Sequence, residues 1–213
     1  MTPLNLPNVI TSVRVALTPV VAILLLQPSL RSRLLAFLVF LLAALSDLWD
    51  GQLARRRDQI TDFGKIVDPV ADKLLVLATL LPLYWIGRQE PELLSIPLYG
   101  GLPLWVVVVL LGREIVITTL RFAAARKGSV VPASLIGKRK ALAQNIFVGS
   151  AMLLVALRTG AVASDWSSSF WYAFQAVNAW FTTGILTVAL LLTVISLFTY
   201  LSSFGRIFAR HQA

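Results

Sequence analysis

Acidic residues are concentrated in one short stretch of the chain. Six of the ten lie within 26 consecutive positions, and these are Asp47, Asp50, Asp58, Asp62, Asp68 and Asp72. Asp47 and Asp50 are three residues apart and Asp68 and Asp72 are four apart, so on a helix each pair shares one face. If a short antiparallel connection joins two such helices, four carboxylates converge on one point. Asp58 and Asp62 fall in the connecting turn, where pairing with neighbouring arginines is the simpler interpretation.

Four carboxylates this close repel one another, so cations must be present or some of the acids must be protonated. Ligation by oxygen alone suits Mg²⁺ or Mn²⁺, and four carboxylates exceed what one ion needs. These ions often bind substrate phosphates as well. Because Arg55, Arg56 and Arg57 follow directly in the sequence, we predict a two-metal site that binds phosphate groups. The structural alternative is that the four aspartates only pair with these arginines.

Two other kinds of site are excluded or disfavoured by composition. The chain has no cysteine, which excludes a disulfide, a thiolate nucleophile and a cysteine-based metal site. Its one histidine, His211, is two residues from the end of the sequence, so imidazole chemistry is disfavoured.

The elements that carry these residues are expected to be membrane helices. Of the 213 residues, 57% are hydrophobic and 14% are charged, whereas a soluble domain has about 45–50% and about 25%. A membrane helix needs roughly 20 apolar residues. Six segments of the sequence approach or reach this length, and they are residues 13–27, 33–55, 66–86, 102–122, 141–157 and 178–201. We therefore predict an all-α, polytopic membrane protein with one domain over residues 1–213, and expect residues 2–11 to form a short interfacial helix.

The basic residues indicate how the helices are oriented. With both termini in the cytoplasm, fifteen of the nineteen Lys and Arg residues fall on the cytoplasmic side. The other four are Arg31, Arg33, Arg88 and Arg158. The net charge of +9 is therefore expected to reflect membrane topology, with the carboxylate cluster at the cytoplasmic surface and no nucleic acid as partner.

The spacing of the aspartates resembles the signature of the CDP-alcohol phosphatidyltransferase family, D-x2-D-G-x2-A-R-x8-G-x3-D-x3-D. All eight defined positions match without a gap, and they are Asp47, Asp50, Gly51, Ala54, Arg55, Gly64, Asp68 and Asp72. The resemblance implies an enzyme that displaces CMP from a CDP-activated lipid or alcohol by a hydroxyl acceptor, with the help of two metal ions. It also implies a homodimer in a bacterial cytoplasmic membrane, with the active site facing the cytoplasm.

The resemblance implies roles for single residues. Asp47, Asp50, Asp68 and Asp72 correspond to metal ligands, and Asp72 also to the general base. Gly51, Ala54, Arg55 and Gly64 correspond to the pocket for the CDP group. Small residues there would also serve helix packing.

Three further segments resemble family members that use glycerol 3-phosphate. Residues 4–14 are similar to the opening N-P-N-x-[IL]-T-x2-R, in which Asn8 and Thr11 are candidate nucleotide contacts, although Asn8 would also cap a helix. Residues 113–121 are similar to R-E-I-x4-L-R, and residues 137–144 to G-K-x-K-T-x2-Q, with Ala141 in place of the usual Thr.

An acceptor that carries its own phosphate requires a cationic pocket, and Arg113, Arg121 and Lys138 are the candidates for it. Alternatively, Arg113 forms a salt bridge with a site aspartate, and Lys138 belongs to a solvated loop. We expect the reaction of CDP-diacylglycerol with sn-glycerol 3-phosphate to give phosphatidylglycerophosphate and CMP. The alternatives are a related transferase that uses phosphatidylglycerol or inositol phosphate and, more remotely, a small ion transporter or channel.

Overall fold

The computed structural model describes residues 6–56, 62–126 and 135–210, and in parts of these ranges (6–8, 47–56, 62–66, 68–69, 122–126, 203 and 205–210) it describes the backbone alone. The described residues form six α-helices, with one isolated antiparallel bridge between Ile96 and Gly100. The helices are α1 (Leu6–Leu26), α2 (Leu30–Arg56), α3 (Asp62–Gln89), α4 (Leu104–Arg126), α5 (Leu135–Ser164) and α6 (Ser169–Arg210). The prediction of an all-α protein is therefore confirmed over these ranges.

The apolar sequence explains why the chain is helical, because a helix satisfies its backbone polar groups internally and so can enter a hydrocarbon layer. The hydroxyl groups on these helices are satisfied in the same way. Thr79, Thr183 and Thr193 are buried, and each donates a hydrogen bond to the carbonyl oxygen four residues earlier. These threonines consequently add little polar surface to the interior of the bundle.

Proline and serine residues define the helix ends. α1 ends one residue before Gln27, which precedes Pro28, and a residue that precedes proline disfavours helical backbone angles. α6 begins after Ser168, whose Oγ accepts a hydrogen bond from the Trp171 backbone N–H at 3.2 Å. This bond is a helix N-cap. It follows a turn in which Asp165 has a φ of 53°.

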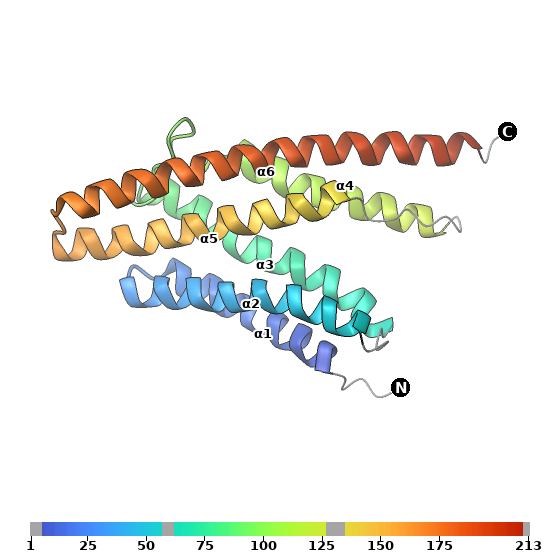
Figure 1. Ribbon diagram of the computed structural model, residues 1–213, viewed down its shortest axis with the longest axis horizontal. Coiled ribbons are helices and arrows are strands. Elements are labelled where there is room, and N and C mark those ends of the chain that lie inside the picture. The colour runs from blue at the N-terminus through green and yellow to red at the C-terminus, as the bar shows by residue number, and fades with distance from the viewer. Residues whose placement is uncertain (1–5, 57–61, 127–134, 211–213) are drawn as a thin grey trace.

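The helices form an elongated bundle in which α5 packs against α6 and α2, and α1 packs against α2 and α3 (Figure 1). α4 packs against α6 and α3. Small residues permit close approach, since a Cβ at Gly149 of α5 would lie 3.5 Å from the ring of Phe40 on α2. The first turn of α1 and the last turn of α6 lie at the same end of the bundle (Figure 1).

Four described segments are long and apolar enough to cross a membrane: Val9–Leu26, Val70–Gln89, Leu135–Ser164 and Ser169–Ser202. The helix α4 is continuous, but its apolar sequence is interrupted by Arg113 and Glu114. The helix α2 carries Arg31 and Arg33 near its start. The protein is thus a helical membrane protein, while the number of six spans stays a prediction.

Two expectations about helix ends differ from the structure. Residues 6–11 form the first turns of α1 rather than a separate interfacial helix, because no breaking residue separates them from the apolar segment. α6 has 42 residues rather than the 24 expected, and at 1.5 Å per residue it is about 63 Å long. The helix continues on both sides of the expected span, through the mostly aromatic and aliphatic residues 169–177 and through residues 202–210. Residues 1–5 lie outside the described part of the chain.

Candidate active site

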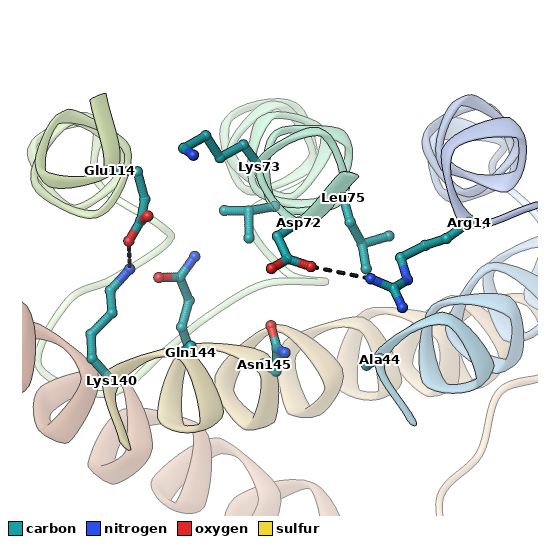
Figure 2. Close-up of a pocket in the computed structure, with 11 residues that line it drawn as sticks. Arg14, Ala44, Asp72, Lys73, Leu75, Glu114, Lys140, Gln144 and Asn145 are labelled. Carbon is teal, nitrogen blue, oxygen red and sulfur yellow. Dashed lines mark hydrogen bonds and ion pairs between the residues drawn. The ribbon is translucent and has the colours of Figure 1, made fainter. Parts of the chain in front are cut away.

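A polar cavity of about 110 Å³ is enclosed by five of the helices, α1 to α5 (Figure 2). Its charged lining residues are Arg14, Asp72, Lys73, Glu114 and Lys140. The uncharged lining residues are Ala44, Leu75, Val76, Ala141, Gln144 and Asn145. Three cations and two carboxylates leave the lining with a formal charge of +1. A cationic cavity of this kind suits an anionic ligand.

One wall of the cavity is formed by an ion pair between α1 and α3. Arg14 Nη1 donates a hydrogen bond to Asp72 Oδ1 at 3.3 Å (Figure 2). The Arg14 side chain is 1% exposed and that of Asp72 is 55% exposed. The carboxylate is therefore held from inside the protein and is accessible from the cavity. The sequence placed Arg14 among the cytoplasmic charges and at the end of the opening motif, but it did not predict the pair with Asp72, because nothing in the spacing links positions 58 residues apart.

The opposite wall is formed by a second charged group, which joins α4 to α5. Glu114 Oε1 accepts hydrogen bonds from Lys140 Nζ and from Arg113 Nη1, both at 2.7 Å. Arg113 Nε donates to Ser196 Oγ of α6 at 3.1 Å. Arg113 thus has Glu114 as its acidic partner, rather than the site aspartate that we considered as an alternative.

None of the three predicted acceptor-phosphate residues lines this cavity, although Arg113 is bonded to its lining residue Glu114. The Arg121 guanidinium lies over the Tyr200 ring, 5.6 Å from its centroid, and Lys138 is exposed in the first turn of α5. The lysines that line the cavity are Lys73 and Lys140. Helical periodicity places Lys140 and Gln144 on one face of α5 and Lys138 about 200° away from Lys140, so it predicts that the two lysines do not face the same cavity.

Of the four predicted metal ligands, Asp72 is the one whose side chain is described, and its carboxylate lines the cavity. Asp68 lies one turn earlier on α3, and Asp47 follows the cavity residue Ala44 by three residues on α2. Asp50 lies on the same helix. No group of three or more acidic or histidine side chains occurs among the residues whose side chains are placed. The carboxylate oxygens of Asp72 are suitable donors for a hard divalent cation.

The predicted CDP contacts lie on helices that line the cavity. Thr11 is buried on α1, three residues before Arg14. For the other predicted CDP contacts the structure describes the backbone alone, and this backbone is helical at each of them: Asn8, Gly51, Ala54, Arg55 and Gly64.

A second cavity of about 330 Å³ adjoins the first, because Ala44 and Asn145 line both. It lies between α2, α5 and α6 and is mostly apolar. Its lining includes Phe37, Phe40, Leu41, Leu142, Ile146, Leu153 and Phe181. Together the two cavities offer a charged chamber next to an apolar one, as an amphipathic ligand such as a phospholipid requires.

Comparison with known proteins decides the family. The sequence profile of the CDP-alcohol phosphatidyltransferases matches residues 4–177. The chain belongs to the CDP-alcohol phosphatidyltransferase family. This match includes all eight positions of the aspartate signature and all the residues that line the polar cavity.

Curated relatives agree with this assignment. The chain is 36% identical to a CDP-diacylglycerol–glycerol-3-phosphate 3-phosphatidyltransferase of Bacillus subtilis, over 83% of this chain and 92% of the relative. It is 32% identical to a protein of the same name from Salmonella choleraesuis, over 90% and 93% of the two chains. A cardiolipin synthase (CMP-forming) of Streptomyces coelicolor is 34% identical, over 79% of this chain and 75% of that protein. The chain is therefore a membrane transferase of phospholipid biosynthesis.

Proposed function

We propose that the chain transfers the phosphatidyl group of CDP-diacylglycerol to sn-glycerol 3-phosphate, giving phosphatidylglycerophosphate and CMP. The observation that carries this proposal is the polar cavity, which Arg14, Lys73 and Lys140 line together with the half-exposed carboxylate of Asp72. A phosphate-bearing acceptor needs such cations, whereas a neutral acceptor such as serine does not. The names of the Bacillus and Salmonella relatives support the same acceptor.

The chemical step is a direct displacement. The primary hydroxyl oxygen of glycerol 3-phosphate attacks the β-phosphorus of CDP-diacylglycerol and forms a new P–O bond. The bond between this phosphorus and the bridging oxygen breaks, so CMP departs with that oxygen. The carboxylate of Asp72 takes the hydroxyl proton, and Arg14 holds this carboxylate in place from the interior. The chain has no cysteine and its one histidine is His211, which favours direct attack over a covalent enzyme intermediate.

Asp47, Asp50, Asp68 and Asp72 would hold two divalent cations, Mg²⁺ or Mn²⁺. When bound, the cations neutralise the diphosphate and stabilise the departing CMP phosphate. Asn8, Thr11, Gly51, Ala54, Arg55 and Gly64 are the proposed contacts of the CDP group.

For the acceptor phosphate, Lys73 and Lys140 join the predicted residues Arg113, Arg121 and Lys138 as candidates, because both lysines line the cavity. Lys140 is also held in position by Glu114. A lysine fixed in this way loses little further freedom when it binds a phosphate oxygen.

The membrane arrangement follows from the same features. The six helices are proposed to cross a bacterial cytoplasmic membrane with both termini, and the polar cavity, on the cytoplasmic side. The apolar cavity between α2, α5 and α6 is proposed to admit part of a diacylglycerol chain from the bilayer. The homodimer implied by the family resemblance stays a prediction.

A second acceptor is favoured by one observation. The Streptomyces relative is a cardiolipin synthase, and the apolar cavity offers room beside the site for a lipid acceptor such as phosphatidylglycerol. The cationic lining favours glycerol 3-phosphate, because phosphatidylglycerol brings one phosphodiester charge where glycerol 3-phosphate brings about two.

The proposed step is tested by following the β-phosphorus. CDP-diacylglycerol labelled with ³²P at this position is incubated with purified enzyme, Mn²⁺ and glycerol 3-phosphate. All label should pass into phosphatidylglycerophosphate, with unlabelled CMP and no labelled protein in a single turnover. Label released in phosphatidic acid together with formation of CDP-glycerol would show attack at the other phosphorus, and labelled protein would show a covalent intermediate.

A further inference from the structure

Gln144 on α5 is buried in the polar cavity, with its side chain 2% exposed. Neither its amide oxygen nor its amide nitrogen has a hydrogen-bond partner within the described part of the chain. A buried polar group without a partner is costly and therefore calls for an explanation. Because Gln144 lines the cavity, its natural partner is a molecule that enters there.

The neighbours of Gln144 show where that molecule would lie. Figure 2 shows its amide between the Glu114–Lys140 pair and Asp72, directed from α5 toward α3. Lys140 lies one helical turn earlier and its ammonium is bonded to Glu114. A ligand that touches the amide therefore has cationic groups on one side and the proposed base on the other.

The chemistry of the amide specifies the kind of group it binds. A glutamine side chain offers one acceptor and two donors and carries no charge. Arg14, Lys73 and Lys140 already provide charge for phosphate in this cavity. The complement of an uncharged donor–acceptor group is a hydroxyl, which donates one hydrogen bond and can accept up to two.

Both substrates of the proposed reaction carry hydroxyl groups, and position decides between them. The predicted CDP contacts on α2 begin at Gly51, seven residues and about 10 Å beyond the cavity residue Ala44. Gly64 lies eight residues before Asp72 on α3. Gln144 lies instead at the level of Asp72, where the acceptor must be deprotonated.

We infer that Gln144 binds the secondary hydroxyl of the glycerol 3-phosphate acceptor and so determines acceptor specificity. The inference rests on the proposed function. The secondary hydroxyl is one carbon from the attacking hydroxyl, so a bond from Gln144 would hold the attacking oxygen near Asp72. An acceptor without this hydroxyl would leave the buried amide unsatisfied, and sites of this kind reject such analogues strongly.

The test compares kcat/KM for sn-glycerol 3-phosphate with kcat/KM for 3-hydroxypropyl phosphate, which lacks only the secondary hydroxyl. The wild-type enzyme is expected to prefer glycerol 3-phosphate by about tenfold to a hundredfold. In Gln144→Met, which keeps the length of the side chain, the preference should fall to within about threefold. Gln144→Leu, which also lacks a hydrogen-bonding group and should likewise lose the preference, provides a second variant if Gln144→Met does not fold. Gln175→Met, a glutamine change outside the cavity, should keep the wild-type preference.

Three results would overturn the inference. Equal use of both acceptors by the wild type would mean that water alone satisfies the amide. An unchanged preference in both Gln144 variants would mean that the residue has only a structural role. Loss of discrimination between CDP-diacylglycerol and its 2′-deoxy analogue in Gln144→Met, with acceptor preference retained, would assign the amide to the ribose. If the wild type makes no product from glycerol 3-phosphate, the proposed function itself fails.

Discussion

Arg14 of α1 and Asp72 of α3 form an ion pair, with 3.3 Å between Nη1 and Oδ1, in which the guanidinium is almost completely buried and the carboxylate is about half exposed. The pair joins two helices at the wall of the polar cavity. Its asymmetry suits a general base, because the buried guanidinium holds the carboxylate from the interior while about half of the Asp72 side chain is exposed.

Replacing Arg14 should therefore reduce the rate of the chemical step. Arg14→Met removes the cation that positions Asp72, and we expect kcat with glycerol 3-phosphate to fall by about tenfold or more. Arg14→Lys keeps the charge but loses the planar donor group, so its rate should be intermediate. Initial rates at saturating substrate measure this effect. The control is Arg31→Met, in the first turn of α2, thirteen residues before the cavity residue Ala44. A kcat for Arg14→Met within twofold of wild type would show that the pair does not serve catalysis.

A metal titration separates the two roles proposed for the aspartates. Asp72→Asn should reduce the rate by about 10²- to 10⁴-fold at every Mn²⁺ concentration, because the variant lacks the base. Asp47→Asn should instead raise the Mn²⁺ concentration for half-maximal activity by about tenfold or more. If excess Mn²⁺ restores the activity of Asp72→Asn, Asp72 serves as a metal ligand and not as the general base. An unchanged titration of Asp47→Asn would place the metal site elsewhere.

A second ion pair, between Arg33 and Glu90, should matter for stability rather than for catalysis. Arg33 is fully buried and donates to both oxygens of Glu90, at 2.8 and 3.4 Å, and to the Leu25 carbonyl oxygen at 3.3 Å. Glu90→Leu would leave the guanidinium buried without its carboxylate. We expect the free energy of unfolding to fall by about 2 kcal/mol. This loss is smaller than for a fully buried pair, because solvent still reaches Glu90.

The double variant Arg33→Leu/Glu90→Leu is the control for this stability prediction. It buries no uncompensated charge, so its unfolding midpoint in detergent should be higher than that of Glu90→Leu alone. A double variant that unfolds at a lower temperature than the single variant would contradict this explanation. Rates below the unfolding temperature should stay at the wild-type level, because Arg33 is about 16 Å along α2 from the cavity residue Ala44.

Much of the architecture could be predicted from local sequence. The length of the apolar segments predicted the helices. The spacing of the aspartate signature predicted the family, which the match to the family's sequence profile confirms. Helix ends were less predictable, because α6 continues beyond its expected span at both ends, through residues 169–177 and 202–210. The convergence of Asp47, Asp50 and Asp68 on Asp72 stays a prediction, since their side chains lie outside the described residues.

Contacts between distant helices could not be predicted from spacing. Arg14 and Asp72 are 58 residues apart, and Glu114 and Lys140 are 26 apart. Their pairing depends on how the helices pack, which no single helical period encodes. The choice between Lys138 and Lys140 depends on the rotation of α5, and this rotation is visible only once its buried face is known.

The absence of cysteine permits a direct test of the proposed orientation. Arg139 is exposed in the second turn of α5, and Ser167 is exposed in the turn after its other end. A membrane-impermeant maleimide applied to intact spheroplasts should label Ser167→Cys. It should label Arg139→Cys only after the membrane is permeabilised. The opposite pattern would invert the topology, and labelling of both in intact spheroplasts would mean that α5 does not cross the membrane.

The central claim is the identity of the acceptor, and a panel of acceptors tests it most directly. Purified enzyme is given labelled CDP-diacylglycerol, Mn²⁺ or Mg²⁺, and one of glycerol 3-phosphate, glycerol, serine, inositol phosphate or phosphatidylglycerol. CMP release and labelled lipid are measured together. The cationic cavity around Asp72 predicts phosphatidylglycerophosphate from glycerol 3-phosphate, at a rate at least about a hundredfold above that with glycerol. No labelled product from glycerol 3-phosphate, together with product from another member of the panel, would contradict the proposed function.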